Sequence, residues 1–188
     1  MPNSSDVRCI AIDNGDNRAA IFFRNGSHYG DASVTTTNAQ IDFTDPARVY
    51  TLPSGMSYDD IVGCSMDDDA NDNATILLRN GTAASTADLG VTSFDQDLAF
   101  SQTTSTYTLP SGFNHSDIIG FVLDTTNSDA VLFFKNLSYA RADSETAPWN
   151  FASVLTFTIS SGGTKDVVGV AFDNGVDTVS MFFRNSTH

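Results

Sequence analysis

A four-fold internal repeat constrains the fold of this chain more than any other feature. A doubled apolar pair followed by a basic residue and Asn recurs every 49 to 56 residues along the 188-residue sequence. A period of this length indicates a repeat architecture, in which neighbouring copies pack on one another to build the core. The four copies of the motif are Phe22–Asn25, Leu77–Asn80, Phe133–Asn136 and Phe182–Asn185.

A second motif lies upstream of the first in every copy. It consists of an Asp, a short apolar run and a second Asp, and it reads "DVRCIAID", "DIVGCSMD", "DIIGFVLD" and "DVVGVAFD". Repeats that start at the first Asp divide a single domain, residues 1–188, into units of about 6–59, 60–116, 117–165 and 166–188. The last unit carries only the first two apolar segments, so we expect it to be incomplete.

The apolar segments have the character of β-strands. They are four to seven residues long, rich in Val, Ile, Phe and Thr, and bounded by Gly, Asn, Asp and Ser, which is typical of strands joined by tight turns. About four such strands in each repeat of this length match one blade of a β-propeller. The sequence therefore predicts an all-β, four-bladed β-propeller with an incomplete last blade. The alternative is a β-trefoil, which is built from three repeats and therefore fits a chain with four copies less well.

The third copy carries a family resemblance. "VLFFKNLSYARAD", residues 131–143, resembles the hemopexin-type repeat, in which a Phe-Lys-Gly turn leads into a strand with Tyr-x-Arg-x-Asp. Asn136 stands where that family usually has Gly, and both residues tolerate a left-handed turn. The resemblance implies a four-bladed propeller whose central channel holds ions through backbone carbonyls and polar atoms. It implies that small residues of the innermost strands leave the backbone accessible there: Cys9, Gly63, Gly120 and Gly169.

One acidic residue stands at the same position before each first strand. In a four-fold arrangement these carboxylates can form a ring at one mouth of the channel and hold calcium or another cation. The alternative is that each Asp caps a single helical turn after a Pro-Ser-Gly-type segment. The four candidate metal ligands are Asp6, Asp60, Asp117 and Asp166.

Charge and composition exclude several classes of partner. The chain has 23 Asp and Glu against 9 Lys and Arg, a formal net charge of −14, which repels nucleic acid and anionic membrane surfaces. The sequence contains no apolar run of about twenty residues, so it does not predict membrane insertion. The N-terminus lacks the pattern of a secretion signal, so both a cytoplasmic and a processed chain fit. Cys9 and Cys64 stand one position out of register in neighbouring repeats, and we expect buried free thiols.

The sequence does not predict an enzyme. The three histidines fall in turns and lack a His-Glu-x-x-His spacing, and neither a Gly-x-Ser-x-Gly elbow nor a phosphate loop is found. Carboxylates are abundant, but their spacing does not repeat from copy to copy in a way that defines an acid–base pair. These features favour a non-enzymatic binding protein.

Carbohydrate is the ligand class that the sequence favours. Sugar sites combine an aromatic ring with polar groups, and such sets recur at near-equivalent positions in the first and third copies. The single Trp follows in a segment without a counterpart in the other copies, where we expect it to be exposed. The alternative is structural packing. The predicted glycan-binding residues are Tyr29, Asp31, Tyr139, Arg141, Asp143 and Trp149.

Two further expectations follow from the repeat. The alternative function is a hemopexin-like carrier that binds a metal ion, a polyamine or a haem-like ligand at the axial channel. An incomplete last blade exposes a strand edge near residues 178–184, and exposed edges pair readily with other strands. We therefore expect a homo-oligomer sealed at this edge.

Overall fold

The computed structural model shows an all-β chain whose strands form four separate sheets. This confirms the expectation of an all-β fold. Short 3-10 turns, such as η2 (Tyr58–Asp60) and η4 (His115–Asp117), precede inner strands. The structure describes residues 4–13, 18–31, 43, 47–66, 73–87, 89, 94–101, 103–125, 127–144, 146–159, 167–173 and 178–183.

Each sheet is built mainly from one repeat. Sheet 1 contains β1 (Val7–Asp13), β2 (Arg18–Phe23), β3 (Ser27–Asp31), β4 (Arg48–Thr51) and β8 (Leu98–Ala99). Sheet 2 contains β5 (Ile61–Met66), β6 (Ala74–Leu78), β7 (Thr82–Ser85), β9 (Thr103–Thr108) and β13 (Trp149–Asn150). Sheet 3 contains β10 (Ile118–Asp124), β11 (Asp129–Phe134), β12 (Ser138–Ala142) and β14 (Ser153–Thr156). In sheet 4 the described strands are β15 (Val167–Asp173) and β16 (Thr178–Phe183).

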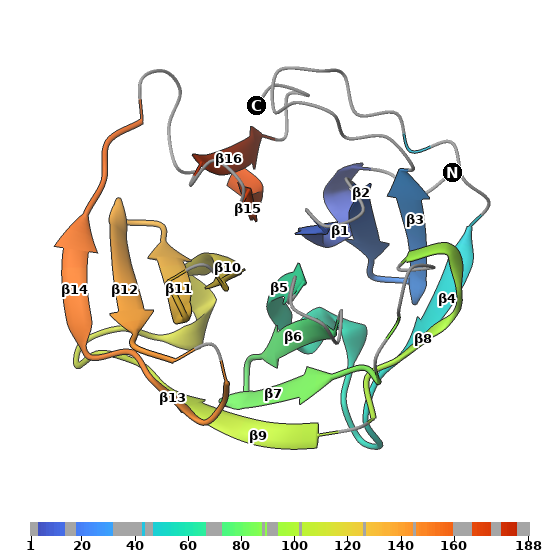
Figure 1. Cartoon of the computed structure of the whole chain (residues 1–188), viewed down its shortest axis with the longest axis horizontal. Coiled ribbons are helices and arrows are strands. Elements are labelled where there is room, and N and C mark those ends of the chain that lie inside the picture. The colour runs from blue at the N-terminus through green and yellow to red at the C-terminus, as the bar shows by residue number, and fades with distance from the viewer. Residues whose placement is uncertain are drawn as a thin grey trace.

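The four sheets are arranged in a ring, with the first strand of each repeat nearest its centre (Figure 1). These inner strands contact one another in cyclic order, β1 with β5, β5 with β10, β10 with β15, and β15 with β1. Four hydrophobic clusters fill the spaces between consecutive sheets. Sheet 3 shows why. Along β11, Leu132 and Phe134 face sheet 2, whereas Val131 and Phe133 face sheet 4, so strand alternation buries both faces.

On three of the four inner strands, a glycine faces a larger side chain from the neighbouring inner strand. A Cβ atom added to Gly63 would lie 2.7 Å from the Cβ of Phe121, and one added to Gly120 would lie 2.3 Å from the Cβ of Val170. Gly169 faces Ile10 in the same way. The expectation that these small residues leave the inner backbone accessible is therefore wrong, because the neighbouring side chains fill the space.

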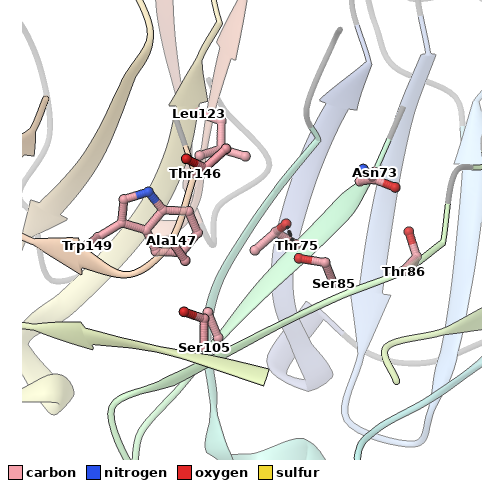
Figure 2. Close-up of a pocket in the computed structure, with 10 residues that line it drawn as sticks. Asn73, Thr75, Ser85, Thr86, Ser105, Leu123, Thr146, Ala147 and Trp149 are labelled. Carbon is pink, nitrogen blue, oxygen red and sulfur yellow. Dashed lines mark hydrogen bonds between the residues drawn. The ribbon is translucent and has the colours of Figure 1, made fainter. Parts of the chain in front are cut away.

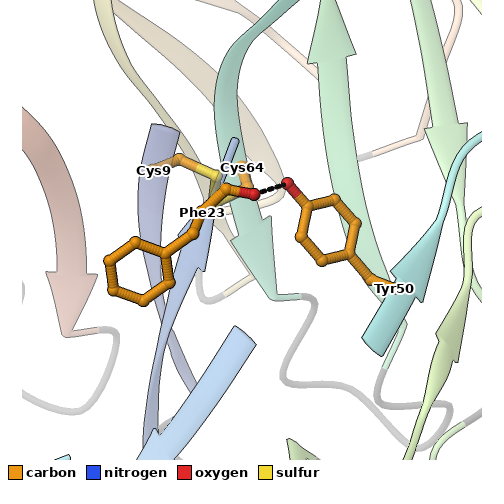
Figure 3. Close-up of a disulfide and its surroundings, with 4 residues drawn as sticks. All are labelled: Cys9, Phe23, Tyr50 and Cys64. Carbon is orange, nitrogen blue, oxygen red and sulfur yellow. Dashed lines mark hydrogen bonds between the residues drawn. A yellow bond between two sulfur atoms is a disulfide. The ribbon is translucent and has the colours of Figure 1, made fainter. Parts of the chain in front are cut away.

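The fourth contact of this ring is a disulfide. Cys9 on β1 and Cys64 on β5 are bonded, with their Cα atoms 5.8 Å apart (Figure 3). The expectation of free thiols is wrong for a geometric reason. The two cysteines are offset by one position between their repeats, and this offset was expected to prevent pairing. The same offset brings each glycine next to a larger side chain at the other three contacts.

The turns after the second strands repeat one design. The Asn side chain accepts a hydrogen bond from the backbone N–H two residues later in all three described copies, at Asn25, Asn80 and Asn136. The left-handed residue is the next one, Gly26, Gly81 or Leu137, with φ of 79°, 84° and 65°. Asn136 therefore does not take the left-handed conformation itself; it caps the turn with its side chain.

Two short parallel strands tie the second and third repeats to the preceding sheets. β8 pairs with β4 through Tyr50 and Leu98, and β13 pairs with β9 through Tyr107 and Trp149. Trp149 thus has a structural counterpart in Leu98, and its segment does repeat. In the first copy, Phe43 stands seven residues before Tyr50, as Phe100 stands seven residues before Tyr107. Phe43 packs with Ile12 and Phe182 between sheets 1 and 4. The predicted edge near residues 178–184 lies partly outside the described residues.

Buried tyrosines hold the outer strands to the turns. The Tyr50 hydroxyl donates to the Phe23 carbonyl at 2.6 Å (Figure 3), and the Tyr107 hydroxyl donates to the Leu78 carbonyl at 2.8 Å. Burial raises the pKa of both phenols well above the ordinary value. Each hydroxyl is a second donor to its carbonyl, which also accepts from the backbone N–H of Gly26 or Gly81 in the turn, so the tyrosines fix the outer strands to these turns.

Candidate ligand-binding site

A cavity of about 230 Å³ opens between sheets 2 and 3 (Figure 2). We call it the intersheet cavity. One side, the hydroxyl wall, carries Thr75 on β6, Ser85 on β7, the following Thr86, and Ser105 on β9. The other side is apolar and consists of Leu123, Ala147 and Trp149, with Thr146 at its rim. Asn73, directly before β6, adds an amide.

The cavity exists because the second copy lacks a ring at one position. In β-sheet register, Phe22 pairs with His28, Leu77 with Ala83, and Phe133 with Tyr139. His28, Ala83 and Tyr139 are therefore equivalent residues of the three repeats. An imidazole and a phenol occupy this position in sheets 1 and 3, whereas the methyl group of Ala83 leaves space in sheet 2.

The hydroxyl wall is ordered by its own hydrogen bonds. The Thr75 and Ser85 hydroxyls lie 2.8 Å apart, and the Thr86 hydroxyl accepts from the Ala74 backbone N–H at 3.0 Å. A hydroxyl has one donor hydrogen and two acceptor lone pairs. The wall can therefore hold its geometry and still bind hydroxyl groups of a ligand.

Trp149 is fixed against the core and presents only a small surface to the cavity. It is 4% exposed, its ring lies 5.3 Å from that of Phe121, and its indole N–H donates to the Ser144 carbonyl at 3.0 Å. The expectation of an exposed Trp is wrong, because β13 draws this residue between the sheets. Its place as a rigid apolar wall is nevertheless compatible with ligand contact.

The other residues predicted from the third copy lie on the opposite face of sheet 3, toward sheet 4. Tyr139 stacks on Phe133 with ring centres 6.1 Å apart. Arg141 binds Asp129 at 3.1 Å and Asp143 at 2.9 Å. Burial raises the pKa of Asp129, and the Arg141 charge opposes that rise. The structure thus brings Tyr139, Arg141 and Asp143 together, but it places them apart from Trp149.

The residues predicted from the first copy do not form an equivalent set. Tyr29 pairs with Ile21 on β2 and packs edge-on against Phe23, with ring centres 5.6 Å apart. Its register counterparts are alanines, and the true counterpart of Tyr139 is His28. Asp31 is the last residue of β3 and pairs with Ala19.

Two of the four leading acids make the cap hydrogen bonds that were the alternative to metal binding. The Asp60 carboxylate accepts from the Ser57 backbone N–H at 3.1 Å, and the Asp117 carboxylate accepts from the Asn114 N–H at 3.0 Å. Asp6 ends η1 (Ser4–Asp6), and Asp166 lies outside the described residues. Within the described part of the chain, no three His, Cys, Asp or Glu residues gather in a way that could hold a metal ion.

His28 gives the fold a pH dependence that can be measured. Its ring is fully buried, and burial lowers its pKa below the ordinary value of 6.5, although the Phe94 carbonyl, 3.1 Å from Nε2, opposes this. The unfolded chain therefore takes up the proton first as the pH falls, which favours unfolding. We expect His28→Gln to reduce the loss of unfolding free energy between about pH 7 and pH 5 by on the order of 1 kcal/mol. Urea unfolding at both pH values checks this, and an equal loss in both proteins contradicts it.

Comparison with known proteins does not assign the chain to a family. A scan against protein-family models finds no match, and a search of the curated proteins finds none either. Over the described residues, no helix has the length and apolar character needed to cross a membrane.

Proposed function

We propose that this chain is a non-enzymatic, lectin-like protein that binds carbohydrate in the intersheet cavity. The observation that carries the proposal is the pairing of the hydroxyl wall with the indole of Trp149 across one cavity (Figure 2). A sugar ring has an apolar face and a rim of hydroxyl groups, and these two walls match those two surfaces.

The cavity volume favours a small ligand. About 230 Å³ is less than the ~300–1,000 Å³ of pockets that hold drug-sized molecules, so a single sugar ring is the ligand that fits. The equivalent positions in sheets 1 and 3 are filled by His28 and Tyr139. We therefore propose one principal site between sheets 2 and 3, instead of the several quasi-equivalent sites expected from the repeat.

We further propose that the ring of sheets is a four-bladed β-propeller of hemopexin-like repeats. The cyclic contacts of the inner strands and the four clusters between consecutive sheets support this architecture. The carrier function receives less support. The inner strands begin around a cavity lined by Arg8, Arg79 and Lys135, and that charge disfavours a metal ion or a polyamine.

Trp149 gives a direct test of carbohydrate binding, because it is the only Trp in the chain. A glycan array identifies candidate sugars. Each candidate monosaccharide is then titrated into the protein, and the Trp149 fluorescence should change until the binding site is saturated. A broad array without any bound glycan contradicts the function. Binding that leaves the fluorescence unchanged contradicts the site.

Two variants test the space in the cavity and its hydroxyl wall separately. Ala83→Tyr introduces the residue that the third copy carries at this position, and it should fill the cavity and abolish sugar binding. Ser85→Ala removes one hydroxyl without adding volume, and loss of one hydrogen bond of about 1 kcal/mol should weaken binding about fivefold. Thr106→Ala on β9 is the matched control, since Thr106 is exposed and does not line the cavity. Equal affinity of Ser85→Ala and Thr106→Ala would contradict the assignment of the hydroxyl wall.

A further inference from the structure

A second cavity, of about 250 Å³, lies where the four inner strands begin. The first residues of β1, β5, β10 and β15 all line it: Val7, Ile61, Ile118 and Val167. It therefore marks one end of the axis around which the sheets are arranged. We call it the basic cavity, because Arg8, Arg79, Lys135 and His115 also line it.

The gathering of cations there is unusual for this chain. The sequence has only 9 Lys and Arg against 23 Asp and Glu, yet three of those nine line a single cavity. Repeat geometry explains part of this, since Arg79 and Lys135 stand at the same position in their copies. Their backbone N–H groups bond the carbonyls of Asp60 and Asp117 at 2.7 and 2.9 Å, which holds both residues beside the starts of the inner strands.

Nearby carboxylates neutralise this charge only in part. Asp59 pairs with Arg8 and also with Arg24, and the Asp60 and Asp117 carboxylates accept cap bonds. The Lys135 ammonium donates to the Ser116 carbonyl at 2.6 Å, and an Arg79 Nη donates to the Asp59 carbonyl at 3.5 Å. Among the described residues, no ion pair joins Arg79 or Lys135 to a carboxylate.

Two buried nitrogens of the basic cavity have no hydrogen-bond partner among the described residues. They are Nε of Arg8 and Nε2 of His115. A buried polar atom without a partner is costly, and in native proteins it often marks the place of a bound water, ion or ligand. The Nε–H of the Arg8 guanidinium is a donor, and Nε2 of His115 donates in one neutral tautomer. Both side chains therefore keep a donor that no described residue uses.

We propose that the basic cavity binds a tetrahedral oxyanion, phosphate or sulfate, either as the free ion or as the terminal group of a larger ligand. Guanidinium and ammonium groups give charge-assisted hydrogen bonds to such oxygens, and Arg8, Arg79 and Lys135 supply them from three strand regions. This site is separate from the intersheet cavity and shares no lining residue with it.

The test is calorimetric titration of the full chain with sodium phosphate and sodium sulfate, at constant ionic strength maintained with sodium chloride. We expect saturable binding of one ion per chain. Glycerol phosphate distinguishes the two sources of the group: binding equal to that of phosphate supports a site for the end of a larger ligand, and weaker binding supports a site for the free ion. Absence of saturable binding of all three probes overturns the proposal.

Variants separate a specific site from general attraction to charge. Arg79→Gln and Lys135→Gln each remove one charge-assisted bond from an exposed residue, and each should weaken phosphate binding about tenfold. Arg48→Gln on β4 removes the same charge away from the cavity and should leave the affinity unchanged. Equal weakening by Arg48→Gln and Arg79→Gln contradicts the site. Ala83→Tyr should not alter phosphate binding, so this proposal and the carbohydrate proposal can fail independently.

Discussion

Replacing both cysteines, as Cys9→Ser/Cys64→Ser, should lower the free energy of unfolding by about 3 kcal/mol and the midpoint of thermal unfolding by about 10 °C. The disulfide closes a loop of 55 residues in sequence separation. In the loop-entropy description, a cross-link of that span raises the free energy of the unfolded chain by about 4 kcal/mol, and measured effects are often somewhat smaller. Both sulfurs lie in the core between sheets 1 and 2, so polar replacements add to the loss.

The measurement needs protein made in an oxidising compartment, because disulfides persist mainly there. A reducing agent should lower the unfolding midpoint of the natural sequence toward that of the double variant, and should leave the double variant unchanged. Thiol titration of the natural sequence in denaturant without reductant should find no free thiol. Two free thiols per chain, together with an unaltered midpoint in the double variant, would overturn the bond.

The fold class was predictable from sequence because the repeat and the strand pattern agree. Short β-branched and aromatic segments separated by turn residues specify strands, and a period near 50 residues specifies how many strands each unit supplies. The contacts between units were less predictable. Sequence alignment shows which residues are equivalent, whereas packing pairs each residue with a neighbour one position further along the next strand. Cys9 and Cys64 were misjudged for this reason.

The candidate site shows the same division between local and long-range information. Trp149 was identifiable as the single Trp, but its burial depends on the parallel pairing of β13 with β9. The hydroxyl wall was not recognisable, because Ser and Thr are common along the whole sequence. The sequence feature that could have indicated the cavity is the missing ring at Ala83, since His28 and Tyr139 supply a ring at this position in the other copies. A register error of one residue, which equated Tyr29 with Tyr139, hid that signal.

Gly120→Ala should destabilise the fold by about 1–3 kcal/mol, as expected for an overpacked core. The added Cβ would lie 2.3 Å from Cβ and 2.5 Å from Cγ2 of Val170. Those atoms are close to the backbone of β15, so relief requires β10 and β15 to separate. Stiffening of the unfolded chain by alanine, about 0.4–1 kcal/mol, offsets only part of this cost. Urea unfolding of the variant and the natural sequence measures the difference.

Gly169→Ala is the matched control, since it places the same methyl group at the equivalent position of the next repeat. Its nearest neighbours are the Cδ1 and Cγ1 atoms of Ile10, both at 3.3 Å. These distances are about 1 Å longer than those at Gly120, so the expected loss is below about 1 kcal/mol. In Gly120→Ala/Val170→Gly both clashing atoms of Val170 are removed, and the double variant should lose less stability than the two single variants together. Equal losses for Gly120→Ala and Gly169→Ala would show that β10 and β15 do not approach as closely as this ring of strands requires.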